Sequence, residues 1–104
     1  MDKLKYSDLL LLGSKQVKQC TKWYFDHNRT VTEACAIGMM TIAKMGSLDG
    51  DILEHEASEL DDTMAQLPDP TGRKNNLSML ITSLNDDEAK TPEQIAEILK
   101  QHGY

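Results

Sequence analysis

Aromatic residues are scarce in this sequence, whose 104 residues include three tyrosines, one tryptophan and one phenylalanine. Leu, Ile, Met and Ala must therefore fill the apolar core, and as a group these residues favour helices over strands. Long apolar runs are also missing, because Leu9–Leu12 falls far short of the roughly 20 residues of a membrane span. The first residues lack the layout of a secretory signal peptide. We therefore expect a soluble, helical, cytoplasmic protein.

Cysteine is equally rare. Cys20 and Cys35 do not form a C-x-x-C pair, so the sequence predicts neither a zinc knuckle nor a thioredoxin-type motif. Two free thiols suit a cytosolic compartment. Metal motifs are missing as well: the sequence after His55 lacks the second His of H-E-x-x-H, and Asp49–Asp51 does not begin a calcium loop. We expect no metal and no other cofactor.

The net charge of −6 is unevenly distributed. Residues 1–44 carry seven basic and four acidic side chains, a net charge of +3, whereas residues 45–104 carry four basic and thirteen acidic ones, a net charge of −9. A net-acidic domain is a poor general binder of nucleic acid, because phosphate contacts need a dominant basic surface. The charge fits a protein partner with a basic surface, or solubility alone.

Apolar residues at three-and-four spacing predict a single all-α domain over residues 1–104, a compact bundle of four to five short helices. The first helix is expected to begin at an N-cap Ser7 and to continue toward Tyr24, unless Gly13 bends or breaks it. Asp26–Arg29 is expected to form a turn.

The least polar part of the chain, residues 34–45, predicts the central helix, which Thr30 or Thr32 should open and Gly46 should end. Gly38 inside this helix predicts the close approach of another helix. A third helix should begin at Asp49 or Asp51 and end near residue 66. Its buried stripe is predicted to consist of Leu53, Ala57, Leu60, Met64 and Leu67.

Two short helices are predicted to follow the polar loop of residues 71–76. Asn75 or Asn76 should cap the first of them. The second has the clearest start signal in the chain, a Thr91 N-cap, a proline at the first helical position and Gln94 completing a capping box. Its inner face is predicted to consist of Ile95, Ile98, Leu99 and His102.

Cys35 is the candidate nucleophile, because it lies near a helix start, where the helix dipole lowers the pKa of a thiol. The chain offers His55, His102, Asn85 and Asp86 as partners in a small cysteine hydrolase. The competing interpretation is a buried core residue among Ala and Ile, which is the usual behaviour of a free cysteine.

The predicted third helix carries seven acidic residues and no basic one between Asp49 and Asp62. Its apolar stripe takes one face, so the other face should turn four candidate partner-binding acids to solvent: Glu54, Glu59, Asp61 and Asp62. A positive surface would compensate this charge. It could be a basic partner, or a stripe of lysines on the first helix, formed by Lys15, Lys18 and Lys22. The acidic face is also compatible with an acidic mimic of nucleic acid, or with a solvated helix surface.

Asn85 and Asp86 follow a short apolar helix and precede a capping box, so they are interpreted as a turn motif between the last two helices. Several short motifs together resemble a family of small uncharacterised proteins of bacteriophages and of bacteria with phage-like genes. The motifs are Trp23, Cys35-Ala36-Ile37-Gly38, Leu84-Asn85-Asp86 and Thr91-x-Glu93-Gln94-Ile95. Members share a C-A-[LI]-G helix start, an N-D turn often preceded by an aromatic residue, where this chain has leucine, and a final T-x-E helix. The resemblance implies a compact helical fold, a phage origin and no known activity.

These observations favour a small, acidic, phage-type protein that is not an enzyme and acts in the host cytoplasm by binding another protein, as an accessory or host-takeover factor. The alternatives are the cysteine hydrolase and the nucleic-acid mimic.

Overall fold

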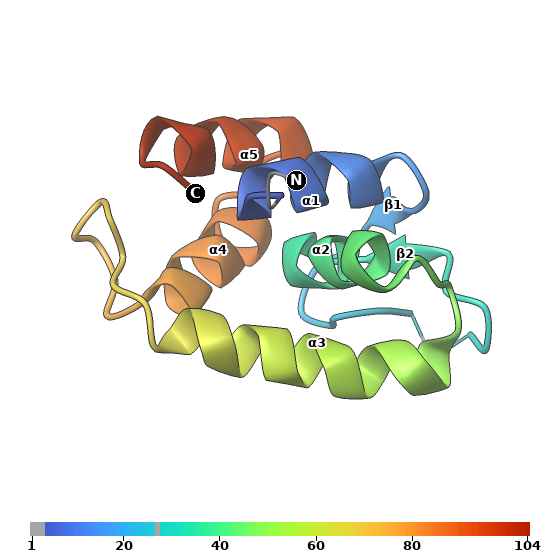
Figure 1. Ribbon diagram of the computed structural model, residues 1–104. Helices are drawn as coiled ribbons and strands as arrows, with labels where there is room; N and C mark the ends of the chain where they lie inside the picture. The colour runs from blue at the N-terminus through green and yellow to red at the C-terminus, as the bar shows by residue number, and fades with distance from the viewer. Residues whose placement is uncertain (1–3, 27) are drawn as a thin grey trace.

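The computed structural model describes residues 4–26 and 28–104. Within them the chain is mostly helical, and the predicted compact helical fold is confirmed (Figure 1). In chain order the elements are α1 (Tyr6–Ser14), β1 (Lys18–Gln19), β2 (Glu33–Ala34), α2 (Ala36–Met45), α3 (Gly50–Ala65), α4 (Leu77–Asp86) and α5 (Pro92–Gln101).

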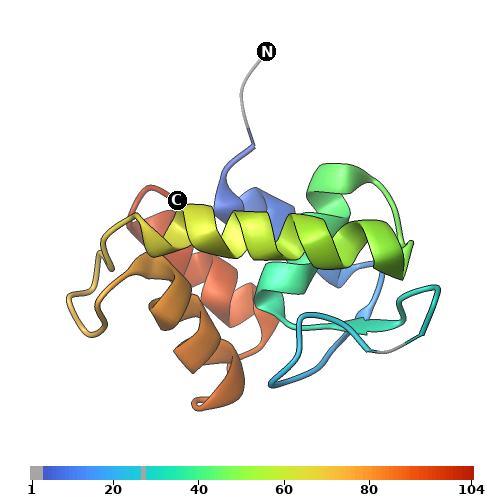
Figure 2. The same ribbon diagram turned by 90° about the horizontal axis from the view of Figure 1, so that it is seen from below.

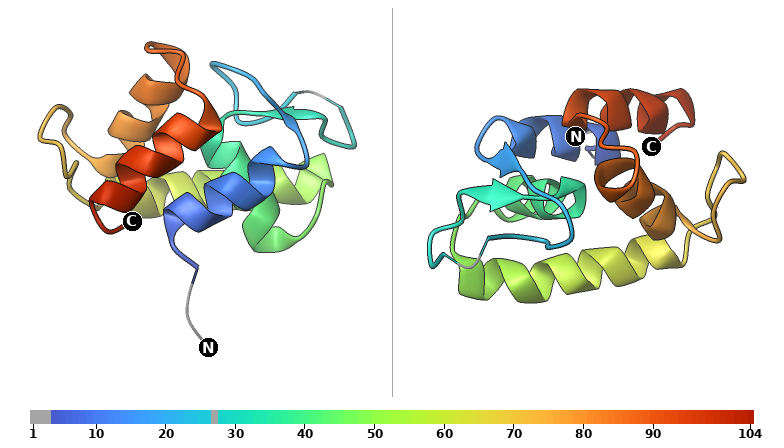
Figure 3. Two further views of the ribbon diagram at one scale, coloured as in Figure 1. Left: turned by 90° about the horizontal axis from the view of Figure 1, so that it is seen from above. Right: turned by 180° about the vertical axis from the view of Figure 1, so that it is seen from behind.

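Helix α2 lies at the centre of three layers. It packs between α1 and α3 and beside α4, while α5 covers α1 and α4 from the opposite side to α3 (Figures 1 and 3). Residues 36–42 of α2 are all buried, which confirms the prediction of a central helix from its lack of polar residues. Figure 2 views the molecule across α3, with α4 on one side and the described residues of the segment 15–35 on the other.

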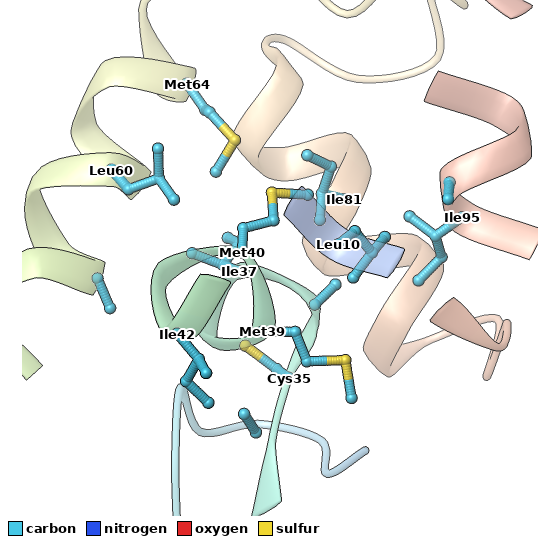
Figure 4. Packing of buried hydrophobic residues seen from close by; sticks show 14 of the residues in the cluster. Leu10, Cys35, Ile37, Met39, Met40, Ile42, Leu60, Met64, Ile81 and Ile95 are labelled. Carbon is cyan, nitrogen blue, oxygen red and sulfur yellow. The ribbon is translucent and has the colours of Figure 1, made fainter. Parts of the chain in front are cut away.

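The core joins all five helices through aliphatic and methionine side chains. Met40 of α2 is fully buried and lies among side chains of α3, α4 and α1 (Figure 4). Its labelled neighbours in Figure 4 include Leu60, Met64, Ile81 and Leu10. Flexible thioethers fill the irregular space between layers. Among the described residues, Phe25 is therefore the only fully buried aromatic side chain that the core needs.

Two glycines allow backbones to come closer than any other residue would permit. A Cβ on Gly13 would lie 1.9 Å from the Met39 carbonyl oxygen, so glycine is what lets α1 pack directly on α2. A Cβ on Gly38 would lie 2.1 Å from the carbonyl oxygen of Tyr24. The close approach predicted at Gly38 is therefore real, but a loop makes it and not a helix.

The predicted N-cap of the first helix is wrong, and the helix does not continue toward Tyr24 but ends at Ser14, directly after the Gly13 at which a bend or break was the predicted alternative. Lys5 occupies the N-cap, and Ser7 lies buried inside the first turn, where its N–H donates to the Tyr104 carbonyl at 2.9 Å. After Ser14 the chain turns through residues 15–17 and enters β1, which pairs in parallel with β2. The turn expected around residues 26–29 includes His27, which lies outside the described residues.

The predicted start of α2 at Thr30 or Thr32 is wrong, because Glu33–Ala34 form β2 and Cys35 is the N-cap. The predicted starts of α3, α4 and α5 are confirmed. Asp49 caps α3, Asn76 caps α4, and Thr91 and Gln94 form the capping box of α5. Gly46 ends α2 with a left-handed φ of 63°. The prediction for His102 is wrong: it is the exposed C-cap of α5, beyond the buried face.

Candidate functional site

A cleft of about 310 Å³ lies between the segment Lys22–Phe25, the start of α2, α3 and the end of α4. Its floor is apolar, because Phe25, Ile37 and Ile81 line it and are almost fully buried. This size and lining are typical of a site that holds one side chain or a small ligand. The cleft forms where the irregular segment of residues 15–35 meets the helices.

The rim of the cleft combines an exposed aromatic ring with carboxylates. Trp23 is 62% exposed, the largest exposed fraction among the large hydrophobic residues described. Glu54, Asp61 and Asp86 contribute three carboxylates against the single ammonium of Lys22, so the rim is net acidic. Lys22 has a left-handed φ of 73°, a conformation that costs energy for a residue with a side chain and that clusters at functional sites.

Asn85 fastens the irregular segment to the helices. The parallel ladder begins with the Lys18 N–H donating to Thr32, and the Cys20 N–H donates to Ala34 at 2.9 Å. A regular ladder would next join the N–H of Ala36 to the carbonyl of Cys20. In this structure the Asn85 carboxamide lies between these two groups and bonds to both of them.

Two hydrogen bonds of the Asn85 carboxamide replace the missing ladder bond between Ala36 and Cys20. Its Nδ2 donates to the Cys20 carbonyl at 3.0 Å, and its Oδ1 accepts from the Ala36 N–H at 3.0 Å. The same Oδ1 accepts from Gln19 Nε2 at 2.9 Å, and Nδ2 also donates to Asp86 at 2.6 Å. Asn85 is only 1% exposed, so its polar atoms are satisfied entirely within the protein.

The interpretation of Asn85 and Asp86 as a turn motif is wrong. Both residues belong to the last turn of α4, and the chain leaves the helix at Asp87. Asn85 continues the apolar face of α4 and follows the buried Leu84. A polar residue at such a position indicates a buried hydrogen bond, and this is the pattern from which the contact could have been predicted. Its partners could not be predicted, because they lie 49 and 65 residues away in the sequence.

Cys35 is the N-cap of α2, so it lies near the start of that helix, as predicted. It also lines the cleft. It is buried and belongs to the core cluster, which agrees with the core interpretation. Burial raises the pKa of its thiol to about 12, although the backbone N–H groups of Gly38 and Ile37 act in the opposite direction. The thiol is therefore protonated at neutral pH, which is unfavourable for a nucleophile.

The candidate partners of Cys35 are only partly brought together. Asn85 and Asp86 line the same cleft, but the Asn85 carboxamide is engaged with backbone groups. His55 is exposed on α3 beside Glu59, with 3.1 Å between Nε2 and Oε1, and His102 is at the end of α5. Neither of these two histidines lines the cleft.

The acidic face of α3 divides into two parts. Glu54, Glu59 and Asp62 are exposed, as predicted. The expectation that Asp61 faces solvent is wrong, because it is half-buried and accepts hydrogen bonds from the hydroxyls of Tyr24 and Ser78. Burial and this hydrogen bond raise the pKa of Tyr24. Asp61 of α3 therefore links Tyr24, in the loop that lines the cleft, to Ser78 of α4.

The predicted lysine stripe is also wrong. Lys15 caps α1, Lys18 lies in β1 and Lys22 lies in the following loop, so these residues do not share a helix face. Among the described residues, Arg73 forms an ion pair with Glu88, and the contact on α3 is that of His55 with Glu59. Pairing of α3 with these lysines therefore does not explain the exposed acids.

Within the described part of the chain, no group of three His, Cys, Asp or Glu side chains could hold a metal ion. None of the described helices has the length and apolar character to cross a membrane. Comparisons of the chain with protein-family models, curated proteins and solved structures found no match.

Proposed function

We propose that the protein is not an enzyme but a binding protein, which holds an apolar side chain flanked by Lys or Arg from a partner protein. The observation that carries this proposal is the cleft, with its apolar floor and its acidic, tryptophan-bearing rim. Exposed tryptophan beside a desolvated pocket is typical of interface residues that dominate binding energy. Because the sequence resembles phage-type proteins, we include in this proposal that the bound partner is met in an accessory or host-takeover role.

Charge complementarity supports a basic partner. Glu54 and Asp86 stand at the rim, and the exposed Glu59 and Asp62 extend the negative surface along α3. Such charges steer a basic partner toward the cleft and raise its association rate. The apolar floor then supplies the specificity for a side chain such as Leu, Met or Phe.

The two alternatives have weaker support. A cysteine hydrolase needs an ionised Cys35, whereas burial raises the pKa of this thiol to about 12. A mimic of nucleic acid needs the acids of residues 49–62 on one exposed surface, whereas Asp61 turns inward and Asp49 caps α3 through the N–H of Asp51.

Titration with short synthetic peptides tests the proposal. Trp23 is the only tryptophan of the sequence, so its fluorescence reports on the rim without labelling. Peptides with Leu, Met or Phe between lysines and arginines should give a saturable change that weakens with salt. Matched peptides with glutamate in place of each base should give none.

Charge-neutralising variants supply the control. Glu54→Gln combined with Asp86→Asn should weaken peptide binding roughly tenfold. Glu93→Gln combined with Glu97→Gln, on the exposed face of α5, removes the same charge away from the cleft and should leave binding unchanged. Failure of every basic–apolar peptide to bind, or equal weakening by both double variants, would contradict the proposal.

A further inference from the structure

Cys20 and Cys35 directly follow the two strands of the small parallel sheet. The ladder places Lys18 opposite Glu33 and Gln19 opposite Ala34. The Cys20 N–H donates to the Ala34 carbonyl at 2.9 Å, which repeats two residues later the bond from Lys18 to Thr32. The next pair in this register is Cys20 and Cys35.

This register suits a disulfide. Strands joined by an intact ladder lie about 4.8 Å apart, and here the last direct ladder bond is that from Cys20 to Ala34, beyond which the Asn85 carboxamide bridges the two backbones. Disulfides span Cα separations of about 4.4–6.8 Å, which leaves room for some widening at this pair. Paired residues of parallel strands direct their side chains to the same side of the sheet. After burial, which is the largest cause, Asp86 helps to raise the pKa of both thiols and Cys20 helps to raise that of Cys35, as expected for neighbouring groups.

We propose that Cys20 and Cys35 form an oxidisable dithiol site whose disulfide weakens binding in the cleft, an inference that rests on the proposed function for its effect. Cys35 lines the cleft, and the Cys20 thiol donates to the Trp23 carbonyl at 3.5 Å. Oxidation removes that donor and draws the Cys35 sulfur toward β1. The floor and the rim of the cleft both change.

The reaction balances with a small disulfide such as oxidised glutathione as the oxidant. The half-exposed Cys20 loses its proton and attacks one sulfur, forming a mixed disulfide and releasing one glutathione thiolate. Cys35 then loses its proton and attacks the Cys20 sulfur, releasing the second glutathione. The two protons convert both thiolates to thiols, so the protein is oxidised by two electrons and the glutathione disulfide is reduced.

Burial, followed by the charges of Glu33, Asp26 and Asp86, raises the pKa of Cys20 to about 11. The Cys35 thiol, whose pKa burial raises to about 12, is deprotonated even less at pH 7, and the second step needs its thiolate. Oxidation should therefore be slow at pH 7 and accelerate as the pH rises.

Mass spectrometry of the native protein treated with oxidised glutathione tests the site. We expect a loss of about 2 Da without lasting glutathione adducts, a proteolytic fragment that joins Cys20 to Cys35, and full reversal by dithiothreitol. Cys20→Ser and Cys35→Ser should each prevent this loss. Stable adducts on Cys20, or disulfide-linked dimers in place of the internal bond, would overturn the proposal.

Binding of the basic–apolar peptides to the reduced and oxidised proteins tests the effect. The oxidised protein should bind several-fold more weakly, whereas oxidant-treated Cys20→Ser should bind like the reduced protein. An internal disulfide with unchanged peptide affinity would overturn the regulatory effect. If the reduced protein binds no peptide, the proposed function fails, and the mass measurement still decides whether the dithiol site exists.

Discussion

The helices and the segment of residues 15–35 are built by different means. The helices use periodic apolar stripes and local caps, so their contacts follow from nearby sequence. The segment contains only four strand residues among those described, and a buried amide and a close backbone contact hold it against α2. The cleft lies along the junction of the two regions, so the junction determines the proposed function.

The largest expected effect comes from the helical core. Met40→Ala removes a fully buried side chain that touches several layers. We expect a loss of about 2–5 kcal/mol in the free energy of unfolding, from lost burial and a cavity. Urea denaturation followed by circular dichroism measures it, and Met79→Ala, at a 45% exposed site on α4, is the control. Similar losses in the two variants would contradict the assignment of the core.

A smaller loss is expected at the junction. Asn85→Ala leaves the Cys20 carbonyl and the Ala36 N–H without their partner, which should cost about 1–3 kcal/mol. Asn75→Ala, in the exposed loop before α4, should stay close to the wild type. Equal denaturation midpoints for Asn85→Ala and the wild type would show that the carboxamide does not stabilise the fold.

The smallest effect is a change of stability with pH. Because burial raises the pKa of Cys35 from 9.0 to about 12, the folded state retains a proton that the unfolded chain releases. The contribution of this group to the free energy of unfolding is fully present below about pH 9. It falls as the pH rises toward 12 and is lower by about 1 kcal/mol at pH 10.

Denaturation at pH 7, 8, 9 and 10 should show this decline in the wild type and a shallower one in Cys35→Ala. Identical pH dependence of the two proteins would show that Cys35 is not the buried thiol described above.

The boundaries of α3 and α5 could be predicted because their signals are local. Asp49 and Thr91 bond to amides two or three residues away, and the apolar stripe of α3 repeats within one element. The first helix is shorter than its apolar spacing predicts, because Val17, Cys20 and Tyr24 keep helical spacing although they lie in the turns and loops on either side of β1. Contacts with α2, distant in sequence, override that pattern.

The candidate site was only partly predictable for the same reason. Cys35 was placed at a helix start from local sequence, whereas the role of Asn85 depends on its contacts with β1 and α2. Trp23 carries no local signal that distinguishes an exposed rim residue from a core residue. The position of Cys20 opposite Cys35 follows from the register of β1 and β2. Strands of two residues carry too little pattern for that register to be predicted from the sequence.

Amide hydrogen exchange of the wild type and Asn85→Ala tests most directly whether this carboxamide holds the cleft wall to the helices. Exchange should accelerate at Cys20, Ala36 and the neighbouring residues 18–25, because their shared anchor is lost. The protected amides of α3 and α5 should keep nearly their wild-type rates. Acceleration spread evenly over all five helices, or no change at Cys20 and Ala36, would contradict the account.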